Sequence, residues 1–116
     1  MRRATRIRRQ TDFAYIRQSG RNRAGRYCAV QIAAARQPGR RVAIVVSRYF
    51  SRKAVERNRA RRLVREACRQ ILPEFGEAWL VLRPRQPIKH AKSPAVAKDL
   101  RRTLQALNGS PGWRLE

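Results

Sequence analysis

The sequence is poor in acidic residues and in histidine, and these shortages exclude most catalytic and metal sites. Its seven Asp and Glu residues are scattered over 116 positions, whereas a two-metal nuclease needs several carboxylates that converge on one place. His90 is the only histidine and lies in the polar segment 87–94, which indicates an ordinary loop residue rather than an acid–base catalyst. We therefore expect no catalytic residue, no metal ligand and no cofactor bound by this chain alone.

Cysteine pairs and long apolar runs are also missing. Cys28 and Cys68 stand 40 positions apart without a CxxC spacing, which indicates reduced thiols packed as small apolar side chains. No run approaches the roughly 18 apolar residues of a membrane-spanning helix. The basic first ten residues are not followed by the apolar stretch of a secretory signal. We expect a cytoplasmic protein with no membrane partner.

Positive charge is what the sequence has in excess. Lys and Arg number 29, and the formal net charge is +22. Such a field destabilises the compact state by self-repulsion and attracts polyanions. Most of these cations are arginines, which suit bidentate phosphate contacts and stacking on bases better than lysine does. Nucleic acid is therefore the expected class of partner.

The apolar pattern predicts an α+β sandwich, in which a small mixed sheet packs against helices in the order α-β-β-α-β-α. The expected elements are a helix at 11–20, strands at 27–34 and 41–47, a helix at 54–72, a strand at 77–84 and a helix at 95–107. Residues 1–107 would form a single RNA-binding domain, and residues 108–116 a disordered tail.

Three local signals refine this fold. Thr11 is expected to cap the first helix and Gly20 to end it. The Pro38-Gly39 turn between the first two strands predicts an antiparallel hairpin. The third strand is apolar from Ala78 to Leu82, as expected of a strand covered on both faces.

The central predicted helix, AVERNRARRLVREACRQIL, carries six arginines among its nineteen residues. Like charges recur at i,i+4, and three such pairs cost an isolated helix on the order of 1 kcal/mol. A solvated charged face would interleave glutamates with the cations, but only Glu56 and Glu66 are present here. An external polyanion, with phosphates meeting guanidinium groups about 6 Å apart along the axis, explains the pattern better.

RNA is favoured over DNA as that polyanion. A helix-turn-helix reader needs another helix packed just before its recognition helix, whereas strands and the basic loop RYFSRK precede this one. Two alternatives remain open: a structural component of the ribosome or another ribonucleoprotein, and a chromosome-compacting protein.

The same helix carries a family resemblance. It matches the hallmark A-x-x-R-N-R-x-[KR]-R-x-x-R-E through Ala54, Arg57, Asn58, Arg59, Arg61, Arg62, Arg65 and Glu66. In this respect the chain resembles the protein subunit of bacterial ribonuclease P, over about residues 5–107. It departs from the family pattern at Ile7, at Ala60, and at Tyr49, where a lysine is common.

The resemblance implies that catalysis belongs to an RNA subunit, which uses bound Mg²⁺ to remove the 5′ leader from precursor tRNA. The protein would bind both RNAs, need no obligate protein partner, and contain a left-handed βαβ crossover. The positions that match the family's contacts to the catalytic RNA are Arg52, Lys53, Arg57, Asn58, Arg59, Arg61, Arg62 and Arg65. Asn58 has both a donor and an acceptor, so it can instead fix local geometry.

The resemblance also implies a cleft for the single-stranded leader, between the first helix and the sheet. Phe13, Arg17 and Tyr27 are the candidates for it. Phe13 can alternatively belong to the core, since Phe13 and Ile16 at i,i+3 suit a helix that docks on a sheet. Stacking on an unpaired base is the other possibility for Phe13, and both possibilities apply equally to Tyr27.

Overall fold

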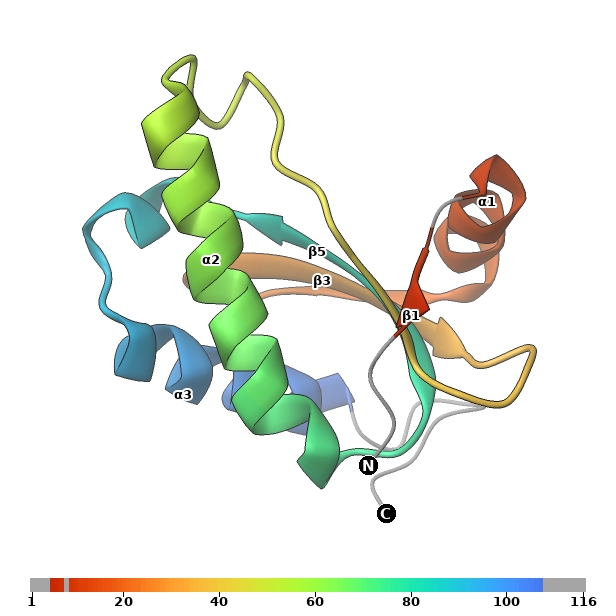
Figure 1. The fold of residues 1–116 in the computed structure, drawn as a ribbon. Coiled ribbons are helices and arrows are strands. Elements are labelled where there is room, and N and C mark those ends of the chain that lie inside the picture. Colours follow the sequence, from red (N-terminus) through yellow and green to blue (C-terminus); the bar gives the residue numbers. More distant parts are fainter. Residues whose placement is uncertain (1–4, 8, 108–116) are drawn as a thin grey trace.

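In the computed structural model, residues 5–7 and 9–107 are described, and the expected tail at 108–116 lies outside them. Helices are α1 (Gln10–Ser19), α2 (Ala54–Ile71) and α3 (Ser93–Leu107), with short 3₁₀ helices η1 (Leu72–Glu74) and η2 (Gln86–His90). Strands are β1 (Thr5–Arg6), β2 (Arg21–Ala24), β3 (Cys28–Ala34), β4 (Arg41–Ile44) and β5 (Ala78–Pro84). Figure 1 shows their arrangement in space.

The strands form one mixed sheet in the order β1-β4-β5-β3-β2. At its centre β5 pairs in parallel with β4 and antiparallel with β3. Every residue of β5 from Ala78 to Leu82 is buried, which confirms the expectation of a strand covered on both faces.

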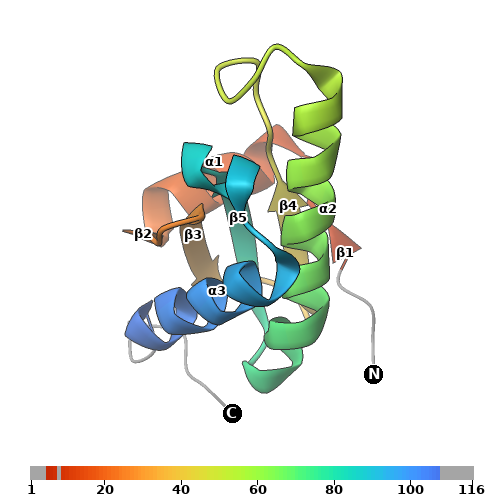
Figure 2. The same cartoon turned by 90° about the vertical axis from the view of Figure 1, so that its left-hand side faces the viewer.

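Helices cover the sheet on both sides (Figure 2): α2 and α3 on one face, α1 on the other. Successive strand residues point to opposite faces, so the sheet contributes to two hydrophobic clusters. The larger cluster joins Val30, Ile32, Leu80 and Leu82 to α2 and α3. The smaller cluster joins Ala33, Trp79 and Val81 to Ile16 of α1. The fold is thus α+β, as predicted.

The predicted hairpin between β3 and β4 is wrong. β5 lies between them, with Val81 facing Gln31 on one side and Ala43 on the other. The turn at Gly39, whose φ of 104° favours glycine, does reverse the chain. β5 lies at the centre of the sheet, and its apolar residues from Ala78 to Leu82 are buried there. The tight hairpin joins β2 to β3 instead.

The connection from β4 through α2 to β5 is left-handed. Both strands are parallel and adjacent. In Figure 2, which views the sheet from the side of α2, both strands run upward and β5 lies to the left of β4. This agrees with the family resemblance and is opposite to the common right-handed rule.

The ends of α1 match the prediction only in part. Arg9 is the N-cap residue and makes no side-chain cap hydrogen bond, so the predicted capping by Thr11 is wrong. Gly20 does end the helix: its N–H donates to the Ile16 carbonyl at 2.8 Å. A Cβ at Gly20 would collide with the backbone of Ile16 and Ile32, so the position needs glycine for close approach.

Candidate nucleic-acid interface

Helix α2 separates an apolar side from a cationic side. Ala60, Val64, Ala67, Cys68 and Ile71 are buried against the sheet and α3. Among the predicted contact residues, Arg52, Lys53, Asn58, Arg62 and Arg65 are exposed, and Arg57, Arg59 and Arg61 are half-buried. Because the apolar stripe must face the core, Arg62 and Arg65 face solvent, whereas Arg59 reaches the neighbouring η2 segment.

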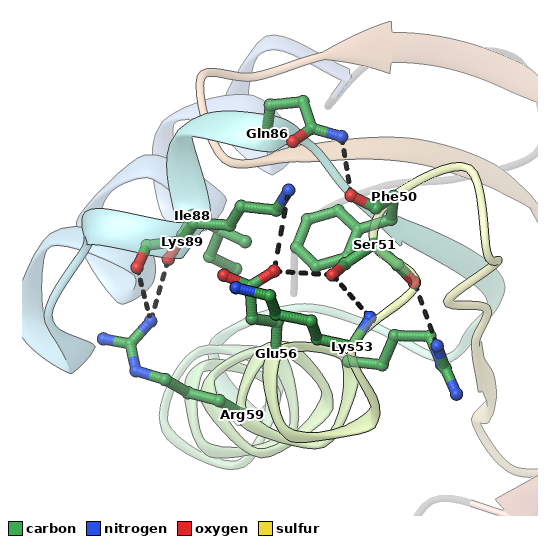
Figure 3. A network of polar contacts seen from close by, with 9 residues as sticks. Phe50, Ser51, Lys53, Glu56, Arg59, Gln86, Ile88 and Lys89 are labelled. Carbon is green, nitrogen blue, oxygen red and sulfur yellow. Dashed lines mark hydrogen bonds and ion pairs between the residues drawn. The ribbon is translucent and has the colours of Figure 1, made fainter.

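The loop before α2 is fixed by two buried residues (Figure 3). Phe50 donates its N–H to the Ser47 carbonyl at 3.1 Å and accepts from the Gln86 amide at 2.8 Å. The Ser51 hydroxyl accepts from the N–H of Lys53 at 3.0 Å and donates to the Glu56 carboxylate at 2.5 Å. These bonds hold the chain in one conformation where it enters the helix.

Glu56 is engaged within the protein. The hydrogen bond from Ser51, followed by the positive charge of Lys89, holds the pKa of the Glu56 carboxyl below its usual value. The Lys89 ammonium lies 3.9 Å from this carboxylate and 5.1 Å from the centre of the Phe50 ring. The glutamate of the first helical turn therefore binds η2 and the loop rather than the arginines of α2.

Arg59 has a structural role that the sequence did not predict. Its guanidinium donates to the carbonyls of Ile88 and Lys89, each at 3.1 Å, and to the carbonyl of Ala91. These carbonyls lie in η2 and just beyond it, and the Ile88 carbonyl also accepts the N–H of Ala91 at 3.1 Å. Arg59 thus ties α2 to η2, and its contact with RNA stays an untested prediction.

Arg57 and Arg61 are held by short-range bonds but keep donors free. Arg57 donates to the Ser51 carbonyl at 2.9 Å, and Arg61 to the Asn58 amide oxygen at 2.9 Å. A guanidinium has five N–H groups, so most of each group is available to a ligand. The Asn58 side chain thus has a partner on its own helix, and its contact with RNA stays a prediction.

An open cleft of about 650 Å³ lies beside the loop, lined by Arg48, Tyr49, Arg52 and Arg57. Arg52 and Arg57 were predicted as contact residues, whereas Arg48 and Tyr49 were not. Arg48 belongs to the basic loop RYFSRK, and that loop was the sequence feature that could have indicated it. Tyr49 is 99% exposed.

The three residues predicted for the leader cleft do not lie together. Phe13 is half-buried against the cluster beneath α1, and Arg17 is exposed on α1 four residues later. Tyr27 packs against the cluster on the opposite face. Its N–H donates to Asp99 of α3 at 3.0 Å, which draws the start of β3 toward that side.

Two residues that the sequence did not indicate lie on the α1 side of the sheet instead. Arg83 donates to the side-chain oxygen of Gln31 at 2.8 Å. Gln31 pairs with Val81, which belongs to the cluster beneath α1, and paired residues share a face. In the sequence, Gln31 is a polar residue inside an apolar strand and Arg83 is an arginine near the end of another strand. No stronger pattern indicated either residue.

The described residues do not fit a protein-held metal ion. Within residues 5–7 and 9–107, no three His, Cys, Asp or Glu side chains gather closely enough to hold one. We therefore assign no step to a metal bound by this chain. None of the helices described is long and apolar enough to cross a membrane.

Comparison with known proteins identifies the family. A family model described as Ribonuclease P matches residues 1–108. The ribonuclease P protein component of Chloroflexus aggregans is 45% identical over 82 residues, covering 71% of this chain and 60% of that protein. That of Roseiflexus castenholzii is 33% identical over 107 residues, covering 92% and 82%. The chain spans about three fifths of the length of the Chloroflexus relatives it matches.

Solved structures agree with this result. The RNase P protein of Staphylococcus aureus has a TM-score of 0.76 and 26% identity, covering 90% of this chain and 95% of that one. The RNase P protein of Thermotoga maritima has a TM-score of 0.76 and 28% identity, covering 90% and 98%. The chain belongs to the ribonuclease P protein family.

Proposed function

We propose that this chain is the RNA-binding protein subunit of ribonuclease P, which assists a catalytic RNA in removing the 5′ leader from precursor tRNA. The observation that carries the proposal is the unpaired cationic surface of α2 and its preceding loop. The ion pairs found within the described residues use Arg41, Arg69, Lys89 and Arg101. None of them neutralises Arg52, Arg57, Arg61, Arg62 or Arg65, so phosphates are the fitting counter-charge.

The two faces of the sheet carry different candidate contact residues, which suggests that each face binds a different RNA. The α2 surface would bind the catalytic RNA, with Arg52, Lys53, Arg57, Arg61, Arg62 and Arg65 as phosphate contacts. The opposite side, with Phe13 and Arg17 on α1 and Gln31 and Arg83 on the sheet, would receive the single-stranded leader. Separate surfaces let one protein hold both RNAs at once. Mg²⁺ and the chemistry would belong to the RNA, because no cluster of metal ligands gathers among the residues that the structure describes.

The test is cleavage of a precursor tRNA by a bacterial ribonuclease P RNA at low Mg²⁺, with and without this protein. Because the protein adds affinity rather than chemistry, we expect cleavage only when both are present, and none with protein alone. The same RNA must be active alone at high Mg²⁺. Absence of stimulation, with that control satisfied, would reject the proposal in favour of a ribosomal role. The cytoplasmic location stays a prediction.

A further inference from the structure

Tyr49 is fully exposed on a segment that is otherwise held in place. The neighbouring residues Phe50 and Ser51 are buried, at 6% and 7% exposure, whereas Tyr49 is at 99%. Figure 3 shows the hydrogen bonds that hold Phe50 to Gln86 and Ser51 to Lys53, and the Phe50 N–H also donates to the Ser47 carbonyl. An exposed aromatic residue is common on protein surfaces, but here a fixed backbone presents the ring to solvent. Ordering such a ring on a ligand costs little, because tyrosine has two side-chain torsions.

The surroundings of Tyr49 select for an anion. Its cleft is otherwise lined by Arg48, Arg52 and Arg57. Glu56, the acidic residue on the first turn of α2, is bonded to Ser51 and faces Lys89 instead. No ion pair within the described part of the chain involves the three arginines. The cleft therefore combines an aromatic face with three guanidinium groups whose charge is uncompensated.

A nucleotide strand has the complementary chemistry, since its phosphates carry the charge and each base has a π-face. We propose that Tyr49 stacks on an unpaired base of an RNA strand whose phosphates bind Arg48, Arg52 and Arg57. In a duplex the base faces are already stacked on their neighbours, so the site should select single-stranded RNA. The choice of RNA rests on the function proposed above, and the base-stacking role of Tyr49 goes beyond it.

The first measurement uses an eight-nucleotide oligo(A) RNA and a blunt-ended duplex RNA, with affinity followed by fluorescence anisotropy at fixed salt. Tyr49→Ala should weaken oligo(A) binding by about 5- to 100-fold and leave duplex binding unchanged. Tyr49→Phe should keep the affinity, since stacking needs the ring and not the hydroxyl. The salt dependence should be unaltered in Tyr49→Ala and shallower in Arg52→Ala, because only the second variant loses a charge.

The fluorescence of a tryptophan placed in the cleft distinguishes RNA binding at this site from binding at other basic surfaces. Tyr49→Trp places an indole in the cleft, and Val55→Trp places one at a matched position, since Val55 is 79% exposed on the first turn of α2. Oligo(A) should quench the fluorescence of the first variant strongly and that of the second weakly. Equal quenching, or an unchanged oligo(A) affinity in Tyr49→Ala, would overturn the proposal.

Failure of this inference can be told apart from failure of the proposed function. If Tyr49→Ala binds oligo(A) as tightly as the unmodified protein, and the unmodified protein still stimulates cleavage of precursor tRNA, only the stacking role is rejected. Equal losses of affinity for oligo(A) and for the duplex would also reject stacking, because they indicate a general loss of RNA binding.

Discussion

At the scale of single residues, arginine serves two opposite purposes in this chain. Arg59 is directed inward and binds three backbone carbonyls at the end of η2 and just beyond it. Arg62, three residues later on the same helix, is exposed, and no hydrogen bond or ion pair to it is found among the described residues. The first stabilises the fold and the second is available to a ligand.

Replacing these two arginines should separate stability from binding. Arg59→Ala removes the guanidinium donor from the carbonyls of Lys89 and Ala91 and leaves the Ile88 carbonyl only the Ala91 N–H, so we expect the free energy of unfolding to fall by about 1.5 to 3 kcal/mol. Arg62→Ala should change it by less than about 0.5 kcal/mol and weaken RNA binding instead. Urea unfolding followed by circular dichroism measures the first effect. Equal stability of the two variants would contradict the role assigned to Arg59.

The Glu56 carboxylate makes stability depend on pH in the acid range. The Ser51 hydrogen bond, followed by Lys89, lowers the pKa of Glu56 in the folded state from its usual value of 4.5. A lowered folded-state pKa adds stability that is present above pH 4.5 and lost as the pH falls through the folded-state value. Below pH 4.5, we expect the free energy of unfolding of Glu56→Gln to depend less on pH than that of the unmodified protein. If urea titrations give free energies of unfolding that fall equally with pH in both proteins, this prediction is contradicted.

At the scale of elements, α2 is helical although its arginines repel one another. The repulsion among its arginines is offset by packing of its apolar stripe on the sheet and α3, and by the Ser51–Glu56 bond at its start. Arg69 near its end forms an ion pair with Glu66. The unneutralised part of the helix therefore lies in its first three turns, next to the loop that bears Tyr49.

Salt dependence of RNA binding tests which part of α2 meets phosphate. Arg61→Ala and Arg62→Ala should each make the slope of log affinity against log salt less steep by about one ion, because each would remove one of the proposed phosphate contacts. Arg69→Ala serves as the matched control, since Glu66 already neutralises that charge, and its slope should change little. A slope equal to that of the unmodified protein in Arg61→Ala and Arg62→Ala would indicate a merely solvated face.

At the scale of the whole molecule, a net charge of +22 acts on a modest amount of apolar core. Self-repulsion favours expansion, and anions that bind the native state oppose it. We expect the free protein to be partly unfolded at low ionic strength and to gain far-UV circular dichroism on addition of sulfate. Sodium chloride at equal ionic strength is the control, since it screens charge without bidentate contacts. An unchanged spectrum with sulfate would contradict the prediction.

The individual strands show which parts of the fold a local sequence pattern can predict. The period of α2 and the apolar run of β5 depend on side chains close in sequence, and both elements were predicted near their observed ends. Strand β2, which is exposed at every position, and strand β1 of two residues have no apolar signal. They form because neighbouring strands offer unpaired backbone groups. Which strands pair is a long-range choice, so the predicted hairpin was wrong.

The sequence by itself determined the charge, the arginine helix and the family, because these depend on composition and on residues at short, regular spacing. The tertiary structure alone decided which of those groups remain free. It directed Arg59 inward to η2, turned Tyr27 away from Phe13, and brought Gln31 and Arg83 together across 52 positions. It also left Tyr49 exposed beside three arginines. The reason is that burial and pairing depend on contacts between distant segments, which no local pattern encodes.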